Sequence, residues 1–231
     1  MKSFRTYSVF LIVLTIYTSS FSQAQDGHGF RFGYIPGYFL KPFRNTQIEA
    51  YKLNQQYPDA SNKMKLPNTH GGWYYGYTYT TDNLVLEFGI SNKFQKDKLK
   101  YTINNVDSVW MMKYRENTIH GGWAFMAGEN VRIGMLIDVN YFALRMVNVA
   151  ADEFKDAAFP KYYQASPQGI GMTYYYDYSF PIVGETVYIH ARPYISWNYS
   201  MEFPYRSQNH LTYYYNLADV GISIQISLGG Y

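Results

Sequence analysis

Apolar and polar residues alternate along most of the chain with a period of two, the pattern of a β-strand whose two faces meet different surroundings. The alternation is clearest near the C-terminus, where Val220, Ile222 and Ile224 are interleaved with Gly221 and Ser223. Eight segments carry this pattern, and we predict a strand in each of them: 30–38, 72–79, 84–91, 122–125, 131–141, 170–178, 187–198 and 220–228.

The polar faces of these segments separate two possible folds. In a soluble β-sandwich the solvent face would be rich in Lys and Glu. Here it holds Gly, Ser and Thr, with isolated charges of both signs. Small residues and paired charges suit the narrow lumen of a closed barrel. The pattern therefore predicts apolar faces that point outward into lipid and polar faces that point inward.

The connections between the segments alternate between short and long. Three are tight, at Thr81–Asp82, Gly128–Glu129 and 180–184. The long polar connections are 41–68, 95–117, 149–166 and 201–212. Outer-membrane barrels have short periplasmic turns and longer external loops. We therefore predict an all-β fold, an eight-stranded antiparallel up-and-down transmembrane β-barrel.

The N-terminus has the composition of a secretory signal. Lys2 and Arg5 are followed by an apolar run over 9–17, and Ser22 and Ala24 supply the small residues at a cleavage site. The apolar run is much shorter than the roughly 20 residues of a spanning helix. We predict a cleaved signal peptide over 1–24, a barrel over 25–231, and an integral outer-membrane location.

Composition supports a membrane barrel and excludes several other classes. Aromatic residues make up 20% of the chain, including 27 Tyr, whereas charged residues make up 16%. Amphipathic rings suit the two membrane–water interfaces. The net charge is only +3, and the basic residues form no cluster of the kind that binds nucleic acid. With no Cys, disulfides and thiol catalysis are excluded, and we expect no cofactor.

In strand pattern and loop asymmetry, the mature chain resembles the small outer-membrane β-barrel proteins of the OmpA/OmpX-like type. The resemblance implies a barrel with a packed interior, inserted by the barrel-assembly machinery. It also implies contact with outer-membrane lipid and lipopolysaccharide, and other outer-membrane proteins are further candidate partners.

Charged residues on the polar faces form a predicted lumen network. Because charges in a low-dielectric interior need partners, we expect ion pairs that neutralise one another. An ion or proton path is the alternative, although eight strands leave little room for one. The members of the network are Arg31, Glu87, Arg132, Asp138, Asp177, His190 and Arg192.

Two further pairs of residues suggest alternative chemistry. His70 and His120 occupy matching positions in the repeated His-Gly-Gly-Trp sequence, face the lumen by parity, and could share a metal ion. Some eight-stranded barrels are lipid-modifying enzymes with Ser and His at the outer rim. Ser207 and His210 share the last external loop here, so they are the candidate nucleophile and base.

The external segment 95–117 contains β-rich runs on either side of Asn104–Asn105, which predicts a hairpin that continues above the membrane. Its apolar residues either pack against neighbouring loops or form a partner-binding surface. The candidate partner-binding residues are Tyr101, Ile103, Val109, Trp110 and Met112.

The sequence therefore favours a structural or interaction protein: a surface scaffold, an adhesin-like protein or an accessory subunit of a larger outer-membrane assembly. A lipid-modifying acyl hydrolase or transferase is the alternative, and a narrow channel comes third.

Overall fold

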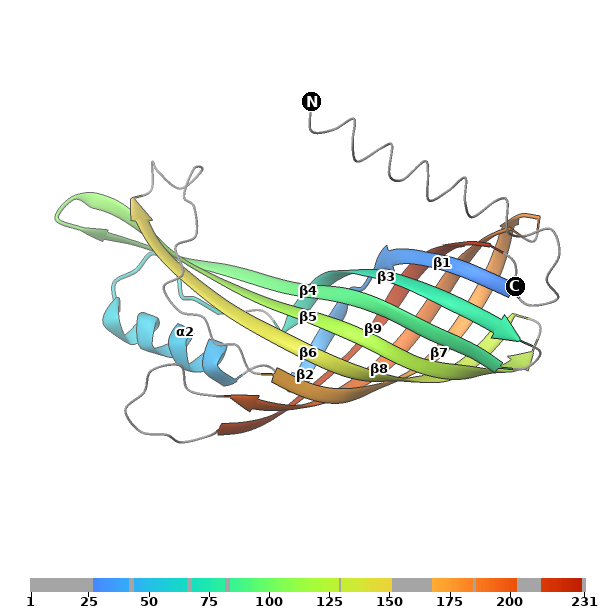
Figure 1. The fold of residues 1–231 in the computed structure, drawn as a ribbon. Coiled ribbons are helices and arrows are strands. Elements are labelled where there is room, and N and C mark those ends of the chain that lie inside the picture. The colour runs from blue at the N-terminus through green and yellow to red at the C-terminus, as the bar shows by residue number, and fades with distance from the viewer. Residues whose placement is uncertain are drawn as a thin grey trace, which may run out of the picture.

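The computed structural model describes residues 27–41, 44–65, 68–81, 84–128, 130–150, 168–184, 186–202 and 213–229 (Figure 1). The signal peptide predicted over 1–24 lies outside these residues, as do Ser207 and His210. The strands are β1 (Gly27–Tyr34), β2 (Gly37–Lys41), β3 (Thr69–Thr81), β4 (Leu84–Ile103), β5 (Val106–Gly128), β6 (Val131–Ala150), β7 (Gln168–Val183), β8 (Val187–Glu202) and β9 (Tyr213–Leu228), with one helix, α2 (Arg44–Gln56). Within the described residues, no helix is both long and apolar enough to span a membrane.

The strands close into a ring in which every neighbouring pair is antiparallel. β1 and β2 lie end to end, and both pair with β3 on one side and β9 on the other. Counted as one interrupted strand, they give the eight members of a closed barrel, which confirms the predicted fold class. Closure leaves no open sheet edge in the lipid-facing region, where an unpaired backbone would be costly.

The first strand was predicted to be continuous over 30–38, and this detail is wrong. The ladder is interrupted at Ile35–Pro36, between β1 and β2. Pro36 has no N–H to give to a ladder, so an interruption is favoured here. The Pro36 carbonyl nevertheless accepts a hydrogen bond from the Ile222 amide at 3.2 Å, and the wall stays closed.

The faces of the strands follow the predicted parity. Apolar side chains point outward and are exposed in the isolated chain, whereas polar residues of opposite parity are buried inside. Near the loop ends of the strands the exposed side chains are aromatic and include Trp73, Tyr141, Trp197 and Tyr199. Near the turn ends they are aromatic again and include Phe125, Tyr176, Tyr178 and Phe180. Between the two groups the exposed side chains are mostly aliphatic and include Ile90, Ile137, Met172, Ile195 and Ile222. An apolar band between two aromatic girdles is the surface that a barrel presents to a bilayer.

Three strands continue far beyond this apolar band. β4 and β5 remain paired from Leu84–Phe125 to Ile103–Val106, and β6 pairs with β5 as far as Ala150. In Figure 1 the three strands reach well past the rest of the barrel, and α2 lies along them. We call this part the platform: residues 93–103, 106–116 and 142–150, together with α2.

The platform replaces two of the predicted loops with regular structure. Segment 95–117 is a β-hairpin, and its two-residue turn has positive φ at Asn104 (52°) and Asn105 (62°). These values match a type I′ turn, which Asn tolerates better than most residues. The prediction of a hairpin is confirmed. Segment 41–68, predicted as a polar loop, contains α2 instead.

One edge of the platform is covered by the segment that follows α2. The Ser61 amide donates to the Lys100 carbonyl at 3.0 Å. The Asn62 side chain donates to the Lys98 carbonyl and accepts from the Lys100 amide, both at 2.7 Å. Its amide group thus occupies the backbone groups of β4 beyond the end of β3.

Candidate functional site

A buried ion cluster occupies the turn-side half of the barrel interior. Arg31 contacts Asp177 at 2.7 Å. Arg192 reaches both carboxylates, Glu87 at 2.9 Å and Asp177 at 3.1 Å. All four side chains are at most 4% exposed, and their two positive and two negative charges balance. The predicted network residues from β1, β4, β7 and β8 therefore meet across the lumen.

Two tyrosines enclose this cluster. The hydroxyl groups of Tyr74 and Tyr175 both donate to Glu87, and the Arg192 guanidinium lies 4.0 Å from the centroid of the Tyr175 ring. Both rings lie against wall positions occupied by glycine, where a Cβ at Gly76 or Gly134 would collide with them. Glycine on the polar face thus makes room for rings as well as for charges.

Two other predicted network residues take positions beside the cluster. Arg132 is 2% exposed, and its position on β6 is paired in register with Asp177 on β7. His190 is fully buried, with Nδ1 3.0 Å from Asp177 and Nε2 2.8 Å from the Ser227 hydroxyl. Asp177 is therefore shared between the guanidinium groups and an imidazole.

Asp138 belongs to a separate group nearer the middle of the barrel. His120 places Nδ1 2.6 Å from Asp138 and Nε2 2.7 Å from the Ser91 hydroxyl. Thr173 donates to the second oxygen of Asp138. The interior thus contains two Asp–His–Ser arrays, which the sequence analysis did not anticipate because their members lie on different strands.

Such an array can activate a serine only where a substrate can reach it. Ser91 is 4% exposed, and it borders a cavity of about 30 Å³ that is also lined by Lys93, Arg192 and Tyr194. One or two water molecules fill a space of this size. The array of Ser227 is similarly enclosed, at 4% exposure. The arrays satisfy buried polar groups, and the cavity has no room for an acyl chain.

A second buried ion cluster lies at the loop end, in the region where the platform leaves the barrel. Lys93 contacts Asp219 at 2.9 Å and Glu116 at 3.5 Å, and His70 contacts Asp219 at 3.1 Å. The sequence analysis missed Lys93 and Glu116 because it placed strand ends near 91 and 122. Extending the period-two pattern through 93 and 116 would have put both side chains inside.

The structure does not bring His70 and His120 together on one partner. His70 bonds Asp219, whereas His120 bonds Asp138 and Ser91. Among the described residues, no group of three or more His, Cys, Asp or Glu side chains is placed to hold a metal ion.

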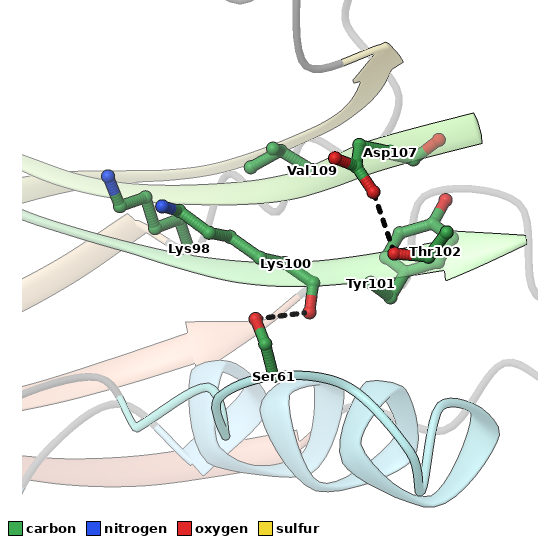
Figure 2. A pocket seen from close by; sticks show the side chains of 8 residues that line it. Ser61, Lys98, Lys100, Tyr101, Thr102, Asp107 and Val109 are labelled. Carbon is green, nitrogen blue, oxygen red and sulfur yellow. Dashed lines mark hydrogen bonds between the residues drawn. The ribbon is translucent and has the colours of Figure 1, made fainter. Parts of the chain in front are cut away.

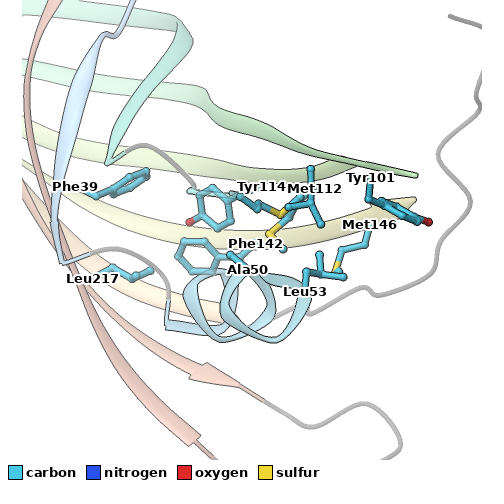
Figure 3. Close-up of a cluster of buried hydrophobic side chains, with 11 residues drawn as sticks. Phe39, Ala50, Leu53, Tyr101, Met112, Tyr114, Phe142, Met146 and Leu217 are labelled. Carbon is cyan, nitrogen blue, oxygen red and sulfur yellow. The ribbon is translucent and has the colours of Figure 1, made fainter. Parts of the chain in front are cut away.

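An apolar core lies on the sheet face of the platform that α2 covers, and Phe39 of β2 and Leu217 of β9 join it from the mouth of the barrel. Figure 3 shows α2 directing Ala50 and Leu53 toward the strands. The cluster comprises Phe39, Ala50, Leu53, Met64, Leu99, Tyr101, Met112, Tyr114, Phe142, Met146 and Leu217, all buried. Tyr57 stacks on Tyr101 with ring centroids 4.1 Å apart. Burial raises the pKa of the Tyr101 hydroxyl above its ordinary value, so the group stays protonated and donates to Asn148 at 2.8 Å.

This core corrects the expectation of an exposed partner-binding face on the hairpin. Tyr101 and Met112 are buried in this core, and Trp110 packs partly against it. Val109 is also buried, but its position on β5 faces the other side of the sheet. Of the five candidate residues, only Ile103, at the tip, is widely exposed, at 49%. The hairpin residues on the α2 side pack against neighbouring segments, the other arrangement that the sequence left open. The helix that covers them was not predicted.

No protein-family model matches the chain, and no curated protein matches its sequence. Among solved structures, the chain is similar to Ail, the attachment invasion locus protein of Yersinia pestis, with a TM-score of 0.48 and 10% identity over 89% of this chain and 100% of that chain. It is also similar to Neisserial surface protein A (TM-score 0.35, 9% identity, 88% and 95% covered). A third is OprG from Pseudomonas aeruginosa (TM-score 0.34, 11% identity, 88% and 93% covered).

The class of fold follows from two observations, the closed ring of strands and the apolar band on its outer surface. The protein is a small eight-stranded β-barrel of the outer-membrane type. The bore holds paired charges, tyrosines and a small buried apolar cluster that includes Ile35, Val85 and Leu136. A second apolar cluster lies where the platform meets the mouth of the barrel.

Proposed function

We propose that the protein is an integral outer-membrane barrel that acts as a structural or interaction protein. In this proposal the platform lies on the cell surface and binds the partner. The observation that carries this proposal is the continuation of β4, β5 and β6 beyond the apolar band as a sheet with an apolar core beneath α2. A membrane anchor alone needs neither the extra strand length nor the helix packed on it.

The rigidity of the platform supports a binding role. Leu99 and Met112 are fully buried against Leu53 of α2, and Asn62 fixes the edge of β4. A surface that is already ordered loses less conformational entropy when a partner binds. A scaffold, an adhesin-like protein and an accessory subunit all fit such a preorganised surface.

The two alternatives receive less support from the described residues. A channel needs a continuous bore, but the lumen holds two buried ion clusters and a cavity of about 30 Å³. A lipid-modifying enzyme needs a nucleophile that an acyl chain can reach, and Ser91 and Ser227 are enclosed. Ser207 and His210 stay a prediction from the sequence.

Surface display can be tested by cysteine labelling, because the chain has no native Cys. Ile103→Cys lies at the platform tip, and Thr186→Cys lies in the exposed turn at the opposite end of the barrel. A membrane-impermeant maleimide should label Ile103→Cys in intact cells and Thr186→Cys only after permeabilisation. The reverse pattern would place the platform in the periplasm and overturn the proposal.

Conductance separates the channel from the interaction protein. We expect the folded barrel to give no stable unitary current steps in planar bilayers at neutral pH. Reproducible steps that disappear with a variant of the lumen, such as Arg192→Gln, would favour a channel instead.

A further inference from the structure

The ion cluster at the loop end connects the base of the platform to the opposite wall of the barrel. Lys93 and Glu116 are the first platform residues above the barrel on β4 and β5, and they are paired in register. Asp219 lies on β9, which pairs with neither of these strands, so the Lys93–Asp219 contact crosses the mouth of the lumen. His70 of β3 contacts the same carboxylate at 3.1 Å. The four side chains are at most 5% exposed.

The imidazole of His70 is in contact with the apolar core of the platform. The ring centroid of Phe39 lies 4.5 Å from that of His70 and 5.9 Å from that of Tyr114. Phe39 and Tyr114 belong to the core that also contains Leu53 of α2. A change in the charge of the imidazole therefore acts at the place where the platform is attached to the barrel mouth.

The loop-end cluster has one more carboxylate than cation while the imidazole is neutral. Lys93 contacts both Asp219, at 2.9 Å, and Glu116, at 3.5 Å. The hydroxyl groups of Tyr114 and Thr118 donate to the two oxygens of Glu116, the arrangement expected around a carboxylate. An uncompensated charge in a dry interior is costly. A proton on the imidazole gives two cations against two carboxylates and removes the excess.

The second ring nitrogen of His70 is the position where this proton can bind. Nε2 lies 3.1 Å from Asp219, whereas Nδ1 is buried and has no hydrogen-bond partner among the described residues. At His120 and His190, both ring nitrogens contact a carboxylate or a hydroxyl. Of the three buried histidines that the structure describes, only His70 therefore has a nitrogen left open for a proton.

The surroundings of His70 offer only one permanent cation. A Cβ at Gly37 would lie 2.5 Å from Nε2 and 2.7 Å from the Tyr194 hydroxyl, so glycine lets both side chains approach this point. The titratable and charged groups around the imidazole are Lys93 of β4, Tyr114 and Glu116 of β5, Tyr194 of β8 and Asp219 of β9. Neither tyrosine can supply a compensating positive charge, so a second cation in this group has to be the imidazole itself.

We propose that the loop-end cluster is a proton-sensitive latch, which holds the platform to the barrel more tightly when His70 is protonated. The proton completes the charge balance only while the platform is attached, because detachment would expose the imidazole and both carboxylates to water. Attachment is therefore strongest at mildly acidic pH and weakens as the pH rises through the range in which an imidazole loses its proton. With one proton coupled, the ratio of attached to detached forms changes by at most about tenfold per pH unit.

The latch goes beyond the proposed function and does not depend on the identity of the partner or on the side of the membrane that the platform occupies. It can therefore be measured in detergent. Failure of Ile103→Cys labelling in intact cells would overturn surface display but would leave the latch untouched.

The hairpin above the latch is braced by contacts of its own, so its tip can report motion at the base of the platform. Figure 2 shows two of these contacts, from the Ser61 hydroxyl to the Lys100 carbonyl and from the Thr102 hydroxyl to Asp107. The Ser61 contact ties the segment that follows α2 to β4. A label at Ile103 therefore moves with the platform as a whole.

The test places one nitroxide label at Ile103→Cys and a second at Trp197→Cys, an exposed position at the loop end of β8. The chain has no native Cys that would take up a label. Pulsed electron paramagnetic resonance measures the distribution of distances between the two labels in the full-length folded protein in a neutral detergent. We expect a narrow distribution at about pH 5.5 and a broad one at about pH 8, which lie on either side of an ordinary imidazole titration. Equal widths at the two pH values would overturn the proposal.

Two conservative variants should change this response in opposite directions. His70→Gln cannot take the proton, so the excess negative charge persists and the distribution should be broad at both pH values. Glu116→Gln leaves Lys93 against Asp219 alone, so the cluster is balanced without the proton and the distribution should be narrow at both. His120→Gln is the matched control, because His120 belongs to the separate group nearer the middle of the barrel, and it should respond to pH as the labelled parent does. A response that survives in His70→Gln, or disappears in His120→Gln, would assign the proton elsewhere and contradict the latch.

A direct measurement on His70 keeps the proposal testable if a variant lacks the gel shift of a folded barrel. Ring nitrogen chemical shifts distinguish imidazole from imidazolium, and they can be recorded by NMR on the otherwise unaltered protein with isotope-labelled histidine in detergent. We expect the His70 signals to change from imidazolium to imidazole between about pH 5.5 and about pH 8. Signals that stay the same over this range would show that His70 is not the switch.

Discussion

The carboxylate of Glu87 is the group on which the turn-side ion cluster depends. It receives two hydrogen bonds from Arg192 and one each from Tyr74 and Tyr175, and it is completely buried. Glu87→Gln keeps the size of the side chain but removes its charge. The cluster then has two guanidinium groups against the single carboxylate of Asp177, which leaves one positive charge without compensation.

The expected cost follows from that imbalance. Removing one partner of a buried ion pair destabilises a protein by about 3–5 kcal/mol. Domains of ordinary stability have only about 5–15 kcal/mol in total, so the loss would be a large part of the whole. With a urea dependence of about 1–3 kcal/mol per M, we expect the unfolding midpoint of Glu87→Gln to fall by roughly 2 M.

The measurement is reversible urea unfolding in lipid vesicles, followed by tryptophan fluorescence. Lys52→Gln, an exposed charge change on α2, is the control and should leave the midpoint unchanged. The double variant Glu87→Gln/Arg192→Gln should lose at least about 2 kcal/mol less than the sum of the two single variants, since coupled neighbours are not additive. Equal midpoints for Glu87→Gln and wild type, or strictly additive losses, would refute this account of the cluster.

Three other predictions follow from different parts of the molecule. Ile137→Arg should cost about 2–4 kcal/mol in vesicles and Ile137→Leu almost nothing, because Ile137 is exposed on the apolar band; equal stability of the two would mean that it does not face lipid. Leu99→Ala should cost about 2–5 kcal/mol and open the platform to limited proteolysis while the barrel keeps its gel shift; resistance equal to wild type would contradict the role of Leu99 in holding α2 on the sheet. Asn105→Val should destabilise the hairpin by about 1–2 kcal/mol because Asn105 has a φ of 62°, whereas Asn105→Gly should be tolerated; hydrogen exchange at the tip distinguishes the two outcomes.

The barrel was predictable because lipid and lumen impose opposite demands on alternate residues. Ile137 and Asp138 are neighbours in sequence, yet one faces the apolar band and the other a buried imidazole. A shift of one residue would exchange them, so the period-two pattern determines the register strongly. The same period-two pattern predicts that Glu87, Asp177 and Arg192 face the interior, where the structure places them.

The platform was less predictable because its parts depend on one another. Among the α2 side chains that the structure describes, only Ala50 and Leu53 enter the core, and the helix has no acidic residue in its first turn and no basic residue in its last. Such a segment cannot be distinguished from a polar loop by its sequence, because its stability as a helix comes mainly from tertiary packing. With no helix predicted over 44–56, the sequence did not indicate which segment covers the apolar residues of the hairpin. The Lys93–Asp219 contact joins two residues that lie 126 positions apart in the sequence, and no local sequence pattern predicts it.

The side chain of Asn62 affects how the exposed edge of β4 can pair with other strands. By donating to the Lys98 carbonyl and accepting from the Lys100 amide, it satisfies the groups on β4 that would otherwise template another strand. The Ser61 amide adds a hydrogen bond to the Lys100 carbonyl, so this stretch of the β4 edge is occupied from within the chain and is blocked for pairing with the strand of a second copy.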